Sequence, residues 1–252
     1  MKKSLFLIAS AFLLIHSGAS SQEKEPAFGI TFSGFVKNDF ILDTRQTISV
    51  REGHFLLYPA DELLDEEGKD INARANFNYL SIQSRLTGKI TGPDAFGAKT
   101  SGVLEGAFFG ATNSDINGFR LRHAFVKLNW TNTELLLGQY WHMKFITACF
   151  PGTISFNTGA PFQYFSRNPQ IRITQRFGKF TIAGMAATER DFSSPGGTEG
   201  LRNALLPDLN GQIVYETKNL MLGATVGYKR IVPRIQTDSL YKTSVGIGGL
   251  SG

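Results

Sequence analysis

Apolar and polar residues alternate along much of this chain, which is the pattern of β-strands with two different faces. In Phe28–Asp43 the even positions are mostly apolar, whereas the odd positions carry Thr, Ser, Lys and Asp. Phe77–Thr91 repeats the pattern, with Leu and Ile on one face and Ser, Gln, Arg, Thr and Lys on the other. Further strands are expected at Ala98–Gly110, Gly118–Trp130, 134–143, 169–178, 179–188, 209–218, 219–231 and 241–250. The pattern predicts an all-β protein of about ten strands.

Strand length and the order of the connections favour a transmembrane barrel over a soluble sandwich. Several predicted strands approach the roughly 9–11 residues that a tilted membrane-spanning strand needs, whereas globular strands peak at about 5–6 residues. Long and short connections alternate along the chain. The long ones are Thr44–Asn76, Lys144–Asn168 and Glu189–Asp208; the short ones include Gly92–Gly97, 131–133 and 218–219. Outer-membrane barrels have this asymmetry, so the sequence predicts an antiparallel up-and-down transmembrane β-barrel.

The first residues have the features of a secretory signal peptide. Lys2 and Lys3 precede the apolar run Leu5–Ile15, and small residues follow at 17–21. The apolar run is shorter than the roughly 20 residues of a membrane-spanning helix. We expect residues 1–21 to be removed during export through the general secretory pathway, leaving 22–252 as the barrel domain. The mature net charge of about +3 is too mild to indicate nucleic-acid binding.

The remaining composition argues against a disulfide scaffold, a metal protein or an enzyme. Cys149 is the only cysteine, so the chain cannot form an internal disulfide. The acidic stretch Asp61–Asp70 lacks the spacing of a calcium-binding loop and is expected to be a solvated surface loop. His54, His123 and His142 stand in no zinc-binding or nucleophile–base pattern. We therefore expect no catalytic residues, no cofactor and no metal site.

Basic residues outnumber acidic ones on the predicted polar faces. The candidate pore-lining residues are Lys37, Arg85, Lys89, Lys99, Arg120, Arg122, Arg172 and Arg176. Arg120 and Arg122 stand two positions apart, so one strand points both in the same direction. Rings of Arg and Lys that line a pore favour anions. The alternative is that these side chains pair with loop carboxylates or hydrate the lumen.

The loop Lys144–Asn168 is a candidate constriction loop. Its aromatic members include Phe150, Phe156, Phe162 and Tyr164. Exposing several such side chains together would forgo about 1.5–3 kcal/mol of burial for each, so we expect the loop to fold into the lumen. The alternative is packing outward against a neighbouring subunit.

Several motifs together resemble DcaP-like porins. They are Gly34–Asp39, Ser81–Phe96, Phe119–Ala124 and Leu137–Tyr140, and the last two also resemble phosphate-selective O/P porins. The resemblance implies a 16-stranded homotrimer with an inward-folded loop in the outer membrane of a Gram-negative bacterium. This chain offers about ten strands and ends in Gly-Gly-Leu-Ser-Gly instead of an aromatic residue. That departure predicts a fragment truncated at its C-terminus.

The predicted function is passive diffusion of small hydrophilic solutes, with a preference for anions such as carboxylates or phosphate. Expected partners are outer-membrane lipid, lipopolysaccharide and two further copies of the chain, with no nucleic acid. The alternative is a secreted or outer-membrane β-protein that binds carbohydrate or mediates adhesion without conducting.

Overall fold

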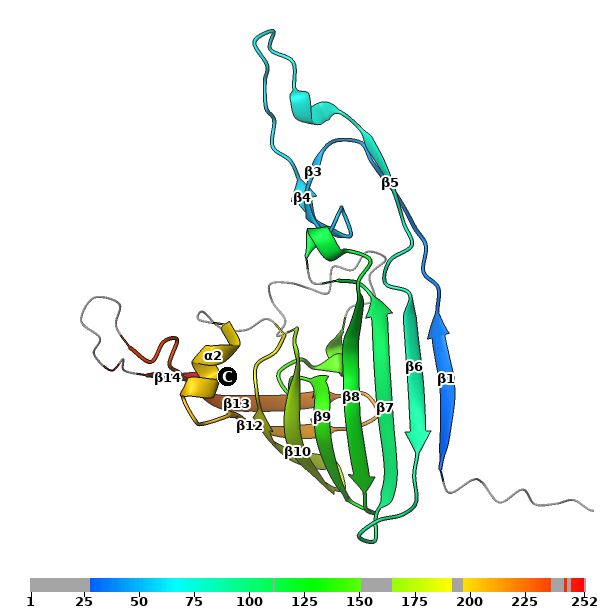
Figure 1. Cartoon of the computed structure of the whole chain (residues 1–252), viewed down its shortest axis with the longest axis vertical. Coiled ribbons are helices and arrows are strands. Elements are labelled where there is room, and N and C mark those ends of the chain that lie inside the picture. Colours follow the sequence, from blue (N-terminus) through cyan, green and yellow to red (C-terminus); the bar gives the residue numbers. More distant parts are fainter. Residues whose placement is uncertain are drawn as a thin grey trace, which may run out of the picture.

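A computed structural model describes residues 28–110, 112–150, 165–191, 197–236, 243 and 246–251 of the chain, so the predicted signal peptide lies outside the described residues. Its main feature is a ten-stranded antiparallel sheet in the order β1-β6-β7-β8-β9-β10-β11-β12-β13-β14 (Figure 1). The strands are β1 (Gly29–Phe35), β6 (Arg85–Thr91), β7 (Lys99–Phe108), β8 (Phe119–Asn129), β9 (Thr133–Trp141), β10 (Arg167–Phe177), β11 (Phe180–Ala187), β12 (Asp208–Glu216), β13 (Met221–Ile231) and β14 (Ile247–Ser251). The predicted all-β, up-and-down architecture is confirmed. Within the described residues β1 and β14 each have one neighbour in this sheet, which is therefore open there.

A two-stranded arm extends β1 and β6 beyond the sheet (Figure 1). It consists of β2 (Asp39–Asp43) and β5 (Asn76–Leu80). The sequence predicted one unbroken strand on each side, but both are interrupted where the arm begins. There Gln83 has a φ of 70°, and the Ser84 hydroxyl accepts a hydrogen bond from the Lys37 N–H at 3.0 Å. Side-chain bonds thus replace the backbone ladder at the junction.

The connection Thr44–Asn76 was predicted as a polar loop, and this was only partly right. It contains the hairpin β3 (Thr47–Val50) and β4 (Phe55–Pro59), followed by the 3₁₀ turn η1 (Ile71–Ala73). The hairpin forms because both short segments are rich in β-branched and aromatic residues.

Regular structure also occurs within the predicted loop 189–208. Helix α2 (Gly197–Asn203) lies beside β13, where the Val232 N–H donates to the Gly200 carbonyl at 2.7 Å (Figure 1). No helix in the described part of the chain is long and apolar enough to cross a membrane.

The two faces of the sheet differ as the period-two pattern predicted. One face, here called the apolar face, carries large exposed side chains from β1 to β14, among them Phe32, Leu104, Ile171 and Val226 at 55–68% exposure. Cross-strand pairing keeps these residues together, since Gly88 pairs with both Phe32 and Leu104. Exposed apolar surface on this scale is unfavourable in water and favourable in lipid.

The opposite face, here called the polar face, is partly covered by the segment that follows β9. The side chain of Met143 packs in a buried cluster with Ala183, Met185 and Ala187, which all point inward from β11. The Met143 carbonyl accepts a hydrogen bond from the Gln212 side chain at 3.2 Å. The chain therefore turns inward after β9 and runs over the polar face of β11 and β12.

Candidate functional site

A β-bulge in β8 builds the centre of the polar face. The pairing of β7 with β8 runs from Glu105–His123 directly to Gly106–Leu121, so Arg122 has no partner in the register. Bulges redirect side chains, and here both Arg122 and His123 are buried, at 5% and 7% exposure. The Gln139 amide of β9 donates to the carbonyls of Leu121 and Arg122 at 3.3 and 3.1 Å, which satisfies the backbone at the bulge.

Two carboxylates hold four arginines around this bulge. Glu105 accepts a hydrogen bond from Arg122 Nε at 2.8 Å and lies 3.6 Å from Arg85 Nε. Thr87 donates to its second oxygen at 2.8 Å.

The other carboxylate comes from the loop after β11. Asp191 lies 3.2 Å from an Arg167 guanidinium nitrogen and 3.9 Å from Arg120. Four guanidinium groups thus share two carboxylates, which leaves an excess of positive charge on the polar face.

Trp141 lies beside two of these guanidinium groups. The ring centroid is 5.0 Å from the Arg167 guanidinium carbon and 5.9 Å from that of Arg122. Phe145 and Phe165 pack against the same ring, at 4.5 and 5.0 Å between centroids. This aromatic shell excludes water from Arg167, which is only 2% exposed.

Arg167 has an unused donor. Within the described residues its buried Nη1 makes no hydrogen bond. Buried polar groups in proteins are nearly always hydrogen-bonded. A small oxyanion could therefore be held at this point by charge and by a free N–H.

A second charged cluster anchors the inward-turning segment. His142 is 1% exposed, and its Nε2 lies 3.2 Å from Asp208 Oδ2 on β12. Asp208 also lies 3.8 Å from Lys229 on β13, and Lys229 pairs with Glu189. Lys144, two residues after His142 in this segment, donates a hydrogen bond to the Ser251 hydroxyl of β14. The start of the predicted constriction loop thus reaches across the polar face to β14.

The predicted pore-lining residues fall into two groups. Arg85, Arg120, Arg122 and Arg172 come together near the bulge; Arg172 lies 5.5 Å from the Tyr140 ring and donates to the Trp141 carbonyl at 2.5 Å.

The other four lie away from this centre. Lys37 pairs with Asp39 at 2.5 Å where the arm begins, and Lys89 is exposed on β6. Lys99 pairs with Asp94 at 2.7 Å beside a turn and is 81% exposed. Arg176 is 50% exposed, 3.9 Å from Glu134. Of the predicted constriction residues, Phe150 is 41% exposed and packs on Phe145 at 5.6 Å, whereas Phe156, Phe162 and Tyr164 lie outside the described residues.

Sequence reasoning missed Arg167, Asp191 and Trp141. Period-two alternation places Arg167 on the face opposite Arg172, because they are five residues apart in one strand. Loop residues such as Phe165 and Asp191 cover the start of β10. Residues there are buried whichever face they point to, so the alternation of the strand does not predict which of them are buried. Asp191 could have been suspected only as a carboxylate in a loop that closes over a basic face. Among the described residues, His, Cys, Asp and Glu side chains form no group suited to a metal ion.

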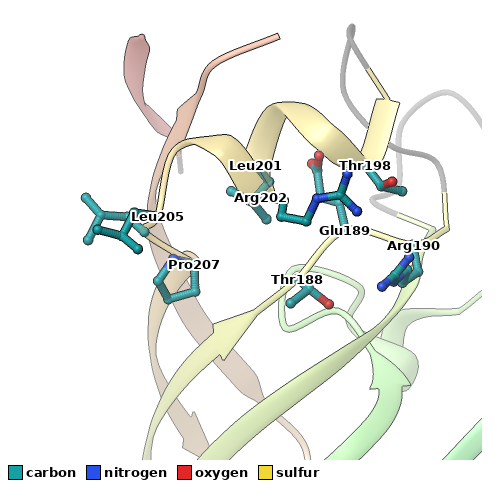
Figure 2. A pocket seen from close by; sticks show the side chains of 9 residues that line it. Thr188, Glu189, Arg190, Thr198, Leu201, Arg202, Leu205 and Pro207 are labelled. Atoms are coloured by element: carbon teal, nitrogen blue, oxygen red, sulfur yellow. The ribbon is translucent and has the colours of Figure 1, made fainter. Parts of the chain in front are cut away.

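The cavity beside α2 lies outside this charged centre. It holds about 190 Å³ and is lined by residues of α2 and its flanking loops, including Arg190, Leu201 and Arg202 (Figure 2). Arg202 is engaged by Glu199 at 2.8 Å. Its lining combines four apolar residues with five polar or charged ones.

Similarity to solved structures decides the fold class. The chain superimposes on the outer membrane channel DcaP of Acinetobacter baumannii with a TM-score of 0.60 and 19% identity, over 90% of this chain and 58% of that one. The sheet has the fold of an outer-membrane barrel. A loop deletion mutant of OmpT, an outer membrane protein of Vibrio cholerae, matches with a TM-score of 0.49 and 10% identity, over 88% of this chain and 60% of that one.

The sequence comparisons add no family to this fold. No family model matches the chain, and no curated protein matches it. This barrel-type chain spans less than two thirds of the length of either structural neighbour.

Proposed function

We propose that this protein forms an outer-membrane channel through which small hydrophilic anions diffuse. The observation that carries the proposal is the division of the sheet into an exposed apolar face and a polar face on which arginines outnumber carboxylates. Lipid would cover the first face, and the second would line an aqueous lumen. The likeness to a solved outer-membrane channel supports this role.

The anion preference follows from the arrangement of charge. Arg85, Arg120, Arg122 and Arg167 are held by Glu105 and Asp191, so the cluster keeps a net positive charge. A positive, partly desolvated wall raises the local concentration of anions and lowers that of cations. Carboxylates and phosphate suit guanidinium donors geometrically. The channel performs no chemical step in this proposal and needs no cofactor.

The segment Lys144–Asn168 would form the constriction. Its first residues already lie over the polar face, held by the Met143 cluster and by the bond between Lys144 and Ser251. The pKa of Lys144 is lowered by burial, an effect that the nearby Asp208 carboxylate only partly offsets. These first residues and Arg172 line one cavity of about 490 Å³. A loop in this position would narrow the lumen beside Arg172.

Membrane lipid and lipopolysaccharide are the proposed partners of the apolar face, and two further copies of the chain would complete a homotrimer. Export would require removal of residues 1–21.

Planar-bilayer recording tests the channel proposal. Arg122 is packed against Glu105, so reversing its charge would place two carboxylates together and disturb folding. Arg120→Glu is a better probe, because the Arg120 side chain is 26% exposed. We expect the reversal potential in a salt gradient to shift toward cation preference.

Lys179→Glu, in the tight turn between β10 and β11, carries the same charge change away from the cluster and should leave the preference unchanged. Wild-type protein that inserts without conducting would contradict the channel and favour an adhesive or carbohydrate-binding β-protein.

A further inference from the structure

The hairpin β3–β4 is fixed against the end of the sheet where the arm begins (Figure 1). The Arg51 N–H, at its tip, donates to the Asn113 side chain at 2.7 Å, and the Arg51 guanidinium donates to the Gly110 carbonyl. The Asn78 amide of β5 donates to the Glu52 carbonyl at 2.5 Å. The tip therefore contacts both the arm and the connection between β7 and β8.

A small hydrophobic core holds the base of this tip. Leu80, Ile82, Phe109 and Ile116 are buried together, and Phe55 of β4 packs on them. His54 is 2% exposed, with its ring 4.9 Å from that of Phe109. A hairpin with this anchoring keeps one position relative to the sheet.

The backbone at the tip adopts an unfavourable conformation. Arg51 and Glu52 have φ angles of 55° and 54°, and Gly53 follows with 85°. The left-handed region costs a non-glycine residue roughly 1–2 kcal/mol. Such conformations persist where the surroundings fix them and often occur at functional positions. Here the strain directs the Arg51 side chain toward the sheet.

The charge of Arg51 interacts with charged side chains of the polar face. Its guanidinium lies 5.1 Å from the Phe109 ring centroid, at the end of the sheet that carries Arg120 and Asp191. Burial, followed by the positive charge of Arg120, lowers the pKa of Arg51, while the Asp191 carboxylate raises it. Arg51 thus extends the row of cations from Arg167 and Arg120 to the mouth of the proposed lumen.

We propose that the β3–β4 hairpin is a fixed charge filter at the mouth of the channel and that Arg51 is the cation an entering anion meets first. This inference rests on the proposed function. The hairpin is a second selectivity element, separate from the segment Lys144–Asn168, because its anchors lie on the arm and on the β7–β8 connection.

Charge exchange in a folded protein tests the inference. Arg51→Cys is made in a Cys149→Ser background, since Cys149 is the only natural cysteine. The purified protein in planar bilayers is treated with a thiol reagent that carries a trimethylammonium group, or with one that carries a sulfonate. We expect the anion-to-cation permeability ratio to be about threefold higher with the cationic adduct at 0.1 M salt. The difference should shrink at 1 M salt, where the screening length falls from about 10 Å to about 3 Å.

Lys69→Cys in the same background is the matched control, because Lys69 is exposed in the acidic stretch Asp61–Asp70, away from the hairpin tip. Its two adducts should give equal permeability ratios. Equal ratios for the two Arg51→Cys adducts would overturn the charge filter even when wild-type protein prefers anions. A wild-type channel without anion preference would instead refute the proposed function.

Discussion

At the residue scale, the centre of the polar face depends on a single extra residue in β8. The bulge places Arg122 and His123 on the same side of the sheet, where perfect alternation would have separated them. Arg122 can then reach Glu105, and its guanidinium approaches Trp141. One local irregularity thus brings side chains from three neighbouring strands together.

Trp141 offers a direct measurement of anion binding at Arg167. Trp130 and Trp141 are the only tryptophans, so Trp130→Phe leaves Trp141 as the sole reporter. We expect inorganic phosphate to change its fluorescence in a saturable manner, because the Arg167 guanidinium, whose Nη1 makes no hydrogen bond within the described residues, lies beside the ring. Arg167→Gln should weaken binding by about tenfold, the loss of one charge-assisted hydrogen bond.

Arg176→Gln removes a more exposed guanidinium from the same face and should leave the titration unchanged. Indistinguishable titrations of the Arg167→Gln variant and its Trp130→Phe parent would refute an oxyanion site at Arg167.

Because His54 is buried, we expect the free energy of unfolding to fall in acid. Burial and then the charge of Lys37 lower the pKa of His54 from 6.5 to about 4. The folded protein therefore binds this proton less readily than the unfolded chain, so stability is full above pH 6.5 and falls between pH 6.5 and about 4. Chemical unfolding at pH 7.5 and pH 5 should show a smaller pH effect in His54→Gln than in the wild type. The same pH effect in both proteins would rule out His54 as the cause.

At the scale of elements, close approach of neighbouring strands shapes β9. Gly138 has a φ of 129°, and a Cβ at this position would overlap the Ala124 carbonyl and lie 2.7 Å from the Phe125 Cα. The segment after β9 then turns inward, where His142 and Met143 hold it on β11 and β12. The close contact between β9 and β8 at Gly138 thus comes just before the chain turns inward after β9.

Gly138→Ala should destabilise the protein by about 3 kcal/mol, because the backbone would have to move at a position with an unfavourable φ. Gly184→Ala is the matched control on β11, since its Cβ would make only an ordinary contact of 3.9 Å with Ile173. Denaturant midpoints of the two variants in detergent measure the difference. Equal midpoints would contradict the strand contact at Gly138.

At the scale of the whole molecule, the sheet separates two environments. The apolar face is continuous from β1 to β14, whereas the polar face carries the paired charges and receives the segment after β9. Apart from irregularities such as the bulge in β8, apolar and polar positions alternate along the long strands, so neighbouring residues of one strand should respond oppositely to a charge.

Ile173 and Thr174 are adjacent in β10 and point to opposite faces; Ile173 is 55% exposed on the apolar side, while Thr174 pairs with Glu134. Ile173→Arg should lower the free energy of unfolding in phospholipid vesicles by about 2–4 kcal/mol, the cost of an arginine facing the middle of the bilayer. Thr174→Arg should change it little, because the new charge lies beside Glu134. Equal effects of both variants would argue against a lipid-facing apolar side.

The sequence by itself determined the class of the fold and the assignment of most residues to a face. Strands such as 119–129 and 167–177 lie close to the predicted positions because period-two alternation depends only on local chain geometry. The same argument placed Arg85, Arg120 and Arg172 on the polar face. No signal peptide structure is described, so removal of residues 1–21 stays a prediction.

Only the tertiary structure decided which charges meet. The bulge at Arg122, the pairing of Asp191 with Arg167 and the fixed position of Arg51 join residues 17 to 62 positions apart. Their encounters depend on strand register, on loop paths and on strained turns, all of which follow from packing between distant segments. Alternation along one strand carries no information about those distances, so the sequence could name the basic residues but not their partners.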